Sequence, residues 1–220
     1  MRPLLAEAFR LHLLAGLEEE LRQGGFHRIA GVDEVGRGCL AGPVVAAAVI
    51  VDPRVLVPGV DDSKRLDAPA REALAVEIRK AALGCAVASV SAIEIDSGDI
   101  LRATRSAMEL ALRALRPAPD CALIDAVALP WLPFPCLPVV RADAMSYAVA
   151  SASVVAKVER DRMMGEYDRT YPQYGFAHHK GYAVAEHRRA IAAYGPSPIH
   201  RLTFGTVVPR AADEHARTVA

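Results

Sequence analysis

Three short apolar runs in this chain each stop at an acidic residue. HRIAGVD ends at Asp33 with Glu34 beside it, CALID ends at Asp125, and LPVVRAD ends at Asp143. In sheets covered by helices on both faces, the functional crevice lies beyond the strand ends, where side chains distant in sequence converge. The pattern therefore predicts that four carboxylates meet at one site. Taken singly, each acid could equally well end a strand or cap a turn.

Clustered carboxylates favour a metal site. Four of them would repel one another and raise their own pKa values unless a cation neutralised the charge. Oxygen-only ligands favour Mg²⁺ or Mn²⁺, and two such ions about 4 Å apart would stabilise the attacking and leaving oxygens of a phosphodiester. The four cysteines form no Cys-x-x-Cys pair, which argues against structural zinc. We expect magnesium or manganese as the cofactor.

Asp33 and Glu34 are neighbours, and neighbouring residues of a strand face opposite sides of a sheet. They can share one site only if the strand ends or bends between them, and Gly36 and Gly38 just downstream provide for a bend. The turn of Gly36, Arg37 and Gly38 is also a candidate ligand contact. Glycines allow close backbone approach, and exposed amides with a guanidinium suit a phosphate or a sugar hydroxyl. A purely steric turn is the alternative.

A basic and aromatic stretch runs from Arg169 to Arg201, with Glu186 as its single acid. Its basic residues are Arg169, Lys180, Arg188, Arg189 and Arg201, and its histidines and aromatics are His178, His179, His187, His200, Tyr171, Tyr174, Phe176, Tyr182 and Tyr194. Because basic groups contact phosphates and aromatic faces lie against bases or sugars, the stretch predicts nucleic-acid binding. A solvated surface segment with a few core aromatics is the alternative.

The composition predicts a cytoplasmic protein with one core. The 220 residues carry 26 basic and 26 acidic side chains, so any electrostatic footprint on nucleic acid must be local. The cysteines are expected to be reduced, buried thiols. Charged residues interrupt the apolar N-terminus at Glu7 and Arg10, which favours a surface helix over a signal peptide. No stretch reaches the about 20 apolar residues that span a bilayer.

Local patterns predict the elements of the first half. Two β-branched runs between residues 28 and 53, separated by glycines, predict a β-hairpin. Asp67 is placed as the N-cap of a helix that Gly84 ends, with Leu74, Ile78 and Leu83 on its buried face. The run CAVASVSAI, residues 85–93, then predicts a third strand.

The second half continues with alternating helices and strands. Helical spacing predicts a helix over residues 100–115 with the apolar positions Ile100, Ala103, Ala107, Leu110, Ala111 and Ala114. CALID and PCLPVV predict two more strands, and a long helix is expected from about residue 146 to 167. The remainder is expected to be loop-rich and partly helical. Together these elements predict an α/β fold, a mixed sheet flanked by helices.

With these residues assembled, the chain closely resembles the ribonuclease HII family over residues 29–209. The matching stretches are AGVDEVGRGCLAGPVVAAAVI, DDSKRL, ALID, SASVVAKVERDRM, YPQYGFAHHKGY and GPSPIHRLTFG. The resemblance implies a ribonuclease H-like fold, with a central mixed β-sheet, flanking helices and a C-terminal helical region from about residue 169. The type 2 ribonuclease H domain is placed at residues 28–209, between an N-terminal helical extension (1–27) and a flexible tail (210–220).

The resemblance implies the activity and the cofactor. A family member would hydrolyse the RNA strand of RNA–DNA hybrids and cut 5′ to single ribonucleotides in duplex DNA, leaving 3′-hydroxyl and 5′-phosphate ends. The catalytic acids, which would hold Mn²⁺ or Mg²⁺ in two-metal-ion catalysis, map onto Asp33, Glu34, Asp125 and Asp143. The implied partners are RNA–DNA hybrids and DNA duplexes containing ribonucleotides. We expect a monomer with no membrane partner.

The resemblance also implies how substrate is bound. The turn that reads the ribose 2′-OH maps onto Gly36, Arg37 and Gly38. Tyr182 matches a tyrosine expected to pack on the following deoxyribose. Ser63 and Lys64 look like contacts to the nucleic-acid backbone, the role that the basic stretch gives to Lys180 and Arg188.

Two local departures from the family pattern concern the acids. Ala126 follows Asp125 where the family commonly has glycine, and Asp143 lies in RADA where bacterial relatives often have lysine-glycine-aspartate-serine. Asp161, in ERDRM, is the competing fourth acid, although its position in a helix rich in charged residues suits a structural ion pair better.

Two other classes of protein share some of these features. A metal-dependent phosphatase or ATPase could also place acids at strand ends, but the chain has no GxxxxGK[ST] phosphate loop. A non-catalytic binder of RNA–DNA hybrids would keep the basic, aromatic stretch and dispense with the acids. Retention of all four acids disfavours it.

Overall fold

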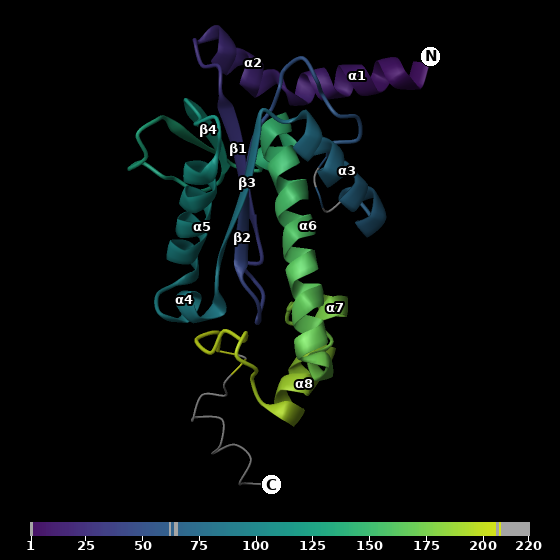
Figure 1. Ribbon diagram of the computed structural model, residues 1–220, viewed down its shortest axis with the longest axis vertical. Helices are drawn as coiled ribbons and strands as arrows, with labels where there is room; N and C mark the ends of the chain where they lie inside the picture. The colour runs from purple at the N-terminus through teal and green to yellow at the C-terminus, as the bar shows by residue number, and fades with distance from the viewer. Residues whose placement is uncertain (1, 62, 64–65, 206, 208–220) are drawn as a thin grey trace.

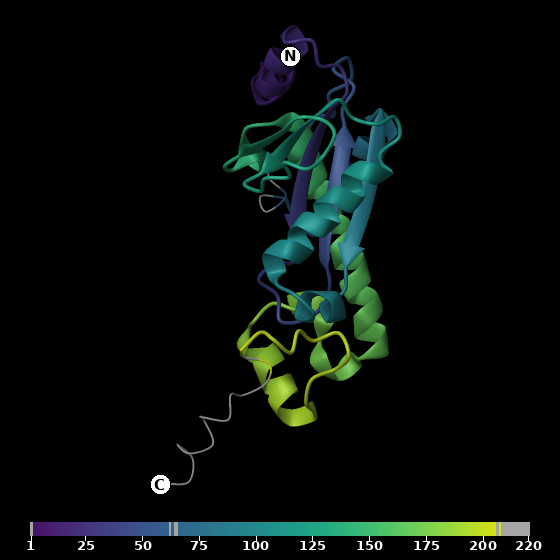
Figure 2. The same ribbon diagram turned by 90° about the vertical axis from the view of Figure 1, so that its left-hand side faces the viewer.

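The computed structural model describes residues 2–61, 63, 66–205 and 207. In this part of the chain, five strands form one mixed sheet in the order β3-β2-β1-β4-β5 (Figures 1 and 2): β1 (Ile29–Val35), β2 (Val44–Ile50), β3 (Gly84–Val90), β4 (Cys121–Asp125) and β5 (Cys136–Val139). Antiparallel pairing joins β1 and β3 to β2, and parallel pairing joins β1 and β5 to β4. The initial hairpin and the mixed sheet are confirmed.

Helices cover both faces of the sheet (Figure 1). On one face α5 packs against β2 and β3, and on the other α6 packs against β1 and β2, with α3 beside α6. The helical elements are α1 (Arg2–Leu14), α2 (Gly16–Gln23), α3 (Ala68–Ala81), α4 (Ala92–Asp96), α5 (Ile100–Ala114), the 3-10 helix η2 (Ala142–Ala144), α6 (Tyr147–Thr170), the 3-10 helix η3 (Pro172–Tyr174), α7 (Phe176–His179) and α8 (Ala185–Tyr194). No described helix is long and apolar enough to cross a membrane.

The central strand β2 is buried along its whole length, because helices cover it from both sides. Successive side chains of a strand point to opposite faces. Ala46 and Ala48 accordingly join the core under α5, whereas Ala47 and Val49 join the core under α6 and α3. The sheet thus divides the apolar interior into two layers.

A glycine in β1 lets the backbone of α6 lie directly against the sheet. A Cβ on Gly31 would lie 2.0 Å from the carbonyl carbon of Ala148 and 2.2 Å from the Val149 nitrogen. The start of α6 is fixed by Glu18 of α2, whose Oε1 accepts hydrogen bonds from Ser146 Oγ (2.6 Å) and the Ala148 amide (2.7 Å). Burial raises the pKa of Glu18. The N-terminal helices are therefore anchored to the helix that supports β1.

Several predicted boundaries and faces are wrong. Leu83 is 41% exposed, because α3 ends at Ala81 and the chain turns into β3 at Gly84. The third strand stops at Val90, and the predicted strand residues that follow form α4, which Ser91 and Glu94 begin with a capping box.

The two long predicted helices are confirmed with small changes. α5 spans Ile100–Ala114, yet Leu110 and Ala114 face solvent, so its buried stripe is narrower than predicted. α6 continues to Thr170, beyond its predicted end. The predicted flexible tail, residues 210–220, lies outside the described residues. All four cysteines are free, as predicted, although Cys85 and Cys136 are only partly buried.

Candidate active site

A cavity of about 260 Å³ lies at the edge of β1, beyond the end of β4. Three of the predicted acids, Asp33, Glu34 and Asp125, line it together with the turn that follows β1. A larger cavity of about 730 Å³, between α3 and the preceding loop, is lined mostly by apolar side chains and contains none of the predicted site residues. Chemistry therefore favours the smaller cavity.

Asp33 and Glu34 both line this cavity although β1 continues through them to Val35. The strand therefore does not end between them, contrary to one of the two expected arrangements. The parallel pairing of β1 with β4 stops at Val32, opposite Ile124. Beyond that pair the edge of β1 is open, so side chains from either face of the strand can reach the same space. Asp125, the last residue of β4, borders that space as well.

The electrostatics of the acids are those of clustered, buried carboxylates. Burial, the charge of Glu34 and the charge of Asp125 raise the pKa of Asp33 well above its ordinary value. Burial also raises the pKa of Glu34, against the opposing effect of Arg37, whose Nη1 lies 3.3 Å from Glu34 Oε1. The other oxygen, Glu34 Oε2, is buried without a hydrogen-bond partner among the described residues.

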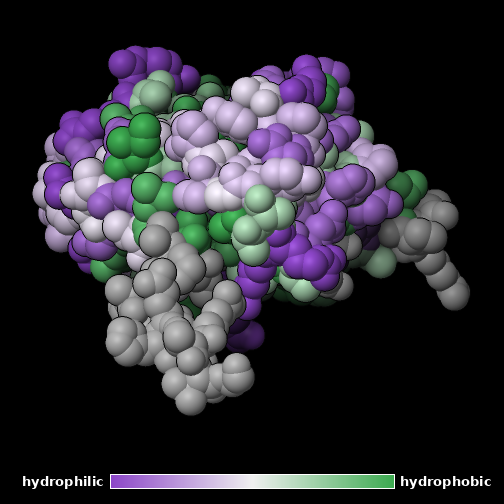
Figure 3. Space-filling model, turned by 90° about the horizontal axis from the view of Figure 1, so that it is seen from below, coloured by the Kyte–Doolittle hydropathy of each residue, from purple (hydrophilic) through white to green (hydrophobic). Residues whose placement is uncertain are grey.

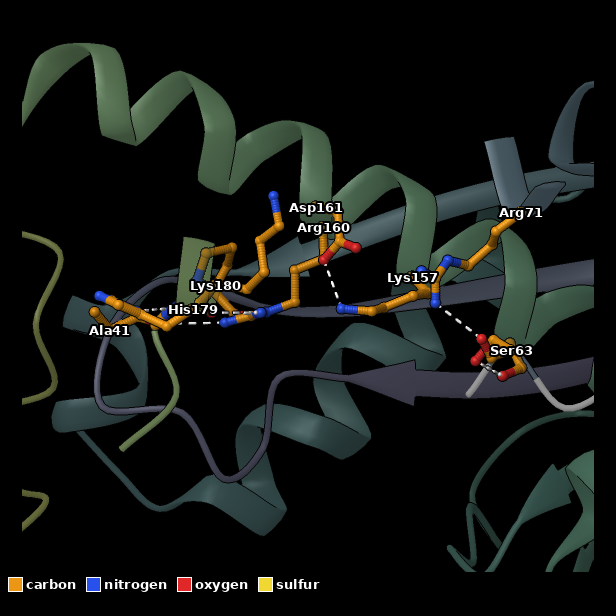
Figure 4. Close-up of polar contacts among 11 residues, drawn as sticks. Ala41, Ser63, Arg71, Lys157, Arg160, Asp161, His179 and Lys180 are labelled. Atoms are coloured by element: carbon orange, nitrogen blue, oxygen red, sulfur yellow. Dashed lines mark hydrogen bonds and ion pairs between the residues drawn. The ribbon is translucent and has the colours of Figure 1, made fainter. Parts of the chain in front are cut away.

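Helix α6 contributes two residues that the sequence interpretation did not single out, Ser153 and Lys157. The Ser153 hydroxyl interacts with Asp33 and lies 2.7 Å from Ser63 Oγ. Lys157 Nζ pairs with Asp161 at 2.6 Å, as Figure 4 shows, which confirms the predicted ion-pair role of Asp161. The spacing of four residues between Ser153 and Lys157 in SASVVAK, one helical turn, was the available signal.

Helix α3 adds one more basic residue that the sequence interpretation missed. Arg71 lines the cavity, and its Nη1 donates to the Ser63 carbonyl oxygen at 2.8 Å (Figure 4). Nothing in the local sequence distinguishes Arg71 from the other exposed cations of an amphipathic helix.

Asp143 lies near Asp125 in space, but it does not line the cavity. It is buried in η2, and Asp125 Oδ1 accepts a hydrogen bond of 2.9 Å from the amide of Ala142, the residue before it. The neighbouring Arg141 adopts the left-handed conformation, with φ of 56°. The assignment of Asp143 as the fourth catalytic acid stays a prediction.

The donor set fits a hard divalent cation in its chemistry. It consists of carboxylates, and a buried, unpartnered oxygen of Glu34 is the kind of atom that a cation would satisfy. Within the described residues, however, no three His, Cys, Asp or Glu side chains are grouped closely enough to hold one ion. The acids share a cavity without forming a ready-made ligand cluster.

The predicted substrate-binding residues fall into two groups. Gly36, Arg37, Ser63 and Tyr182 line the cavity. Gly38, Lys180 and Arg188 do not, and Lys64 lies outside the described residues. A Cβ on Gly38 would meet nothing within 4 Å, so the space beside this glycine is open.

The two basic residues of the C-terminal region sit differently. Lys180 caps α7 with a φ of 51° and is half-buried. Arg188 is exposed on α8, at the end of the molecule opposite the N-terminal helices (Figure 1). The surface seen from that end is mostly hydrophilic, with smaller hydrophobic patches (Figure 3).

Much of the basic and aromatic stretch is interior, which corrects part of its interpretation. Arg201 has no exposed surface, so it cannot contact a phosphate from this position. Tyr174 and Phe176 are buried and stacked, with ring centroids 5.3 Å apart. His187 and His200 are also buried, with 3.0 Å between their Nε2 atoms. The alternative of core aromatics thus holds for these residues.

Comparison with known proteins decides the family. The family model described as Ribonuclease HII matches residues 30–207. The chain is 52% identical to ribonuclease HII of Chloroflexus aurantiacus over 197 residues, which cover 87% of this chain and 93% of that protein. It is 53% identical to ribonuclease HII of Geobacillus kaustophilus, over 86% of this chain and 73% of that protein. The chain belongs to the ribonuclease HII family.

Solved structures agree with this ribonuclease HII assignment. Ribonuclease H2 of Pyrococcus horikoshii superposes with a TM-score of 0.72 at 28% identity, covering 87% of this chain and 99% of that one. A Bst-RNase HIII structure in complex with Mn²⁺, at 22% identity and a TM-score of 0.67, covers 91% of this chain and 71% of that one and shares the fold. The ribonuclease H-like fold is confirmed. As a ribonuclease HII the chain is a hydrolytic endonuclease that degrades RNA in RNA–DNA hybrids.

Proposed function

We propose that this ribonuclease HII also cuts duplex DNA on the 5′ side of a single embedded ribonucleotide, leaving 3′-hydroxyl and 5′-phosphate ends. The observation that carries the proposal is the composition of the 260 Å³ cavity. Asp33, Glu34 and Asp125 line it beside Gly36 and Arg37, the turn that resembles a reader of the ribose 2′-OH. Acids for phosphodiester hydrolysis and a sugar-reading turn thus border the same space.

The acids would hold two divalent cations, Mg²⁺ or Mn²⁺, with Asp143 completing the set. When bound, such ions activate water and stabilise the leaving oxygen of a phosphodiester. The Bst-RNase HIII structure in complex with Mn²⁺ supports a divalent cation in this fold. Burial and neighbouring carboxylates raise the pKa values of Asp33 and Glu34, so their charged forms are disfavoured. A bound cation would offset the repulsion between these carboxylates and stabilise the charged forms.

The remaining residues of the cavity would bind and orient the duplex. Lys157 of α6 and Arg71 of α3 add positive charge to the lining of the cavity, where they would attract a phosphate. Tyr182 is 41% exposed, and its ring would pack on the deoxyribose that follows the ribonucleotide. Arg188, exposed on α8, would contact phosphates at a distance from the cut. We expect a cytoplasmic monomer.

A duplex with one ribonucleotide, labelled at the 5′ end, tests the proposal. With Mg²⁺ or Mn²⁺ it should be cut once, 5′ to the ribonucleotide, while the all-DNA duplex of the same sequence stays whole. A deoxyribose would leave the polar groups of the turn unpaired, at a cost of about 1–3 kcal/mol each. Comparable cleavage of the all-DNA duplex would contradict the proposal.

Two carboxylate variants make a matched control for that assay. Asp125→Asn removes a charge at the cavity with little change of volume and should abolish cleavage while duplex binding persists. Asp161 does not line the cavity, and Asp161→Asn removes the charge that pairs with Lys157, so this variant should act mainly through stability. If Asp161→Asn abolished cleavage without a loss of thermal stability, Asp161 would replace one of the proposed acids.

A further inference from the structure

Arg201 is buried beneath the turn that follows β1, and its guanidinium hydrogen-bonds to backbone carbonyls. Nη2 donates to the carbonyl oxygens of Gly36 (2.7 Å) and Gly42 (2.8 Å), Nε donates to Gly42 (3.0 Å), and Nη1 donates to the Arg37 carbonyl oxygen (2.8 Å). No described carboxylate forms an ion pair with it. Burial lowers the pKa of Arg201 to about 10, so it remains charged at neutral pH. Burying a charge without an ion-pair partner is costly, and here three carbonyl dipoles and the ring of Phe204, whose centroid lies 5.1 Å from the guanidinium carbon, offset that cost.

The segment that carries Arg201 is fixed on both sides. The Arg201 amide donates to the Leu40 carbonyl oxygen at 2.9 Å, and the Gly42 amide donates to Ile199 at 2.8 Å. On its other side Asp96, at the end of α4, accepts hydrogen bonds from the amides of Leu202 (2.7 Å) and Thr203 (3.1 Å). The guanidinium therefore acts on the turn from a rigid support.

Carbonyl positions fix amide positions, because a trans peptide is planar and its C=O and N–H point in opposite directions. Holding the Gly36 carbonyl directs the Arg37 N–H away from Arg201, and holding the Arg37 carbonyl directs the Gly38 N–H likewise. Neither amide donates a hydrogen bond to another described residue. Gly36 and Arg37 line the cavity, and the space beside Gly38 is open. Two consecutive amides thus lack a partner among the described residues, on peptide units whose carbonyls bind Arg201.

We propose that Arg201 is a positioning residue for sugar discrimination: by holding the carbonyls of Gly36 and Arg37, it presents the Arg37 and Gly38 amides to the ribose. This inference rests on the proposed reading of ribose by the turn. Through Arg201, the GPSPIHRLTFG stretch would contribute to the discrimination between ribose and deoxyribose, although Arg201 itself does not contact the substrate.

The chain offers a matched control in Arg160 of α6, which is equally buried. Its guanidinium also binds backbone carbonyls, those of Pro43 (3.1 Å), Lys180 (2.9 Å) and Ala41 (3.2 Å). Figure 4 shows it reaching from α6 toward Ala41 and Lys180. Arg160 also packs beside the turn, since a Cβ on Gly36 would lie 2.2 Å from its Nε and its guanidinium carbon lies 5.9 Å from the Tyr182 ring centroid. It differs from Arg201 in that none of its carbonyl partners belongs to a peptide unit that carries the Arg37 or Gly38 amide. A lysine at either position keeps the charge and loses the planar fork of donors.

The test compares Arg201→Lys with Arg160→Lys in binding, without divalent metal so that no cleavage occurs. Fluorescence anisotropy gives Kd for a duplex with one ribonucleotide and for the all-DNA duplex of the same sequence. Arg201→Lys should reduce the preference for the ribonucleotide by up to about tenfold for each hydrogen bond lost, with the all-DNA Kd nearly unchanged. Arg160→Lys should lower the Tm similarly and keep the preference. Equal loss in both variants, or an unchanged preference in Arg201→Lys, overturns the inference.

A second measurement uses the wild-type protein and so does not depend on the folding of a variant. Amide hydrogen exchange followed by NMR should be fast at Arg37 and Gly38 and slow at Leu40 and Gly42, whose amides bind Gly181 and Ile199. Slow exchange at Arg37 and Gly38 would overturn the inference. A wild-type protein without any ribose preference would instead refute the proposed function, and the exchange data would then show only whether the Arg37 and Gly38 amides are free.

Discussion

Gly31→Ala tests whether the close contact between β1 and α6 supports the active site. The new Cβ would lie 2.0 Å from the Ala148 carbonyl carbon, and ordinary contacts begin at 3.4 Å, so the gap must widen by about 1.4 Å. Backbone lies on both sides, and neither can rotate away as a side chain would. Overpacking typically costs about 1–3 kcal/mol, and we expect the upper end of that range. Widening the gap would also draw Ser153 of α6 away from Asp33 of β1.

Equilibrium urea denaturation of Gly31→Ala and of Gly165→Ala measures this effect. Gly165 lies in the same helix, and a Cβ there would meet nothing within 4 Å, so the control should gain about 0.5–1 kcal/mol from helix propensity. Cleavage by Gly31→Ala, under conditions where it is folded, should fall because Asp33 loses its Ser153 contact. A free energy of unfolding for Gly31→Ala within about 0.5 kcal/mol of the wild-type value would refute the reasoning, since two backbone segments in contact cannot move apart at so small a cost.

Three further outcomes follow from the geometry. Burial and the charge of Glu34 raise the pKa of Asp33, so without metal the folded state loses stability as pH rises from 3.8 through the raised pKa. Asp33→Asn should therefore raise Tm at neutral pH while abolishing cleavage. A lower Tm would contradict this. Ala126 has a φ of 50°, and Ala126→Gly should add up to about 1 kcal/mol in urea denaturation, whereas no gain would mean that the left-handed conformation costs little. Burial lowers the pKa of His200 to about 4, so the free energy of unfolding should fall as pH drops from 6.5 toward 4. This fall should be smaller in His200→Asn. An equal fall in the wild type and the variant would mean that other groups cause it.

Local chemistry explains what could be predicted from the sequence. β1 and β4 are runs of apolar residues that end at acids, and their parallel pairing brings those ends to the same edge of the sheet. The N-cap side chains of Asp67 and Asp99 accept hydrogen bonds from the backbone amides of Ala70 and Arg102, each three residues further along the chain. The local sequence is therefore sufficient to predict where α3 and α5 begin.

One local signal was readable and missed. Ser91 and Glu94 have the spacing of a capping box, which ends β3 and begins α4. The β-branched run before it outweighed this signal in the prediction of a strand to residue 93. The predictions for Leu83 and Leu110 failed for different reasons. Leu83 lies beyond the end of α3 at Ala81, whereas Leu110 fits the helical period of α5 but lies outside the face that this helix buries against the sheet.

Long-range contacts explain the remainder. Arg188 and Arg201 both belong to one basic stretch, yet the first is exposed and the second has no exposed surface. What separates them is a partner 159 to 165 positions away, since Arg201 finds the carbonyls of Gly36, Arg37 and Gly42 only in the folded chain. A count of charges treats both arginines as phosphate contacts. Only the exposed Arg188 is accessible to a phosphate, because the guanidinium of Arg201, bound to carbonyls beneath the turn, has lost the solvent access that a phosphate contact requires.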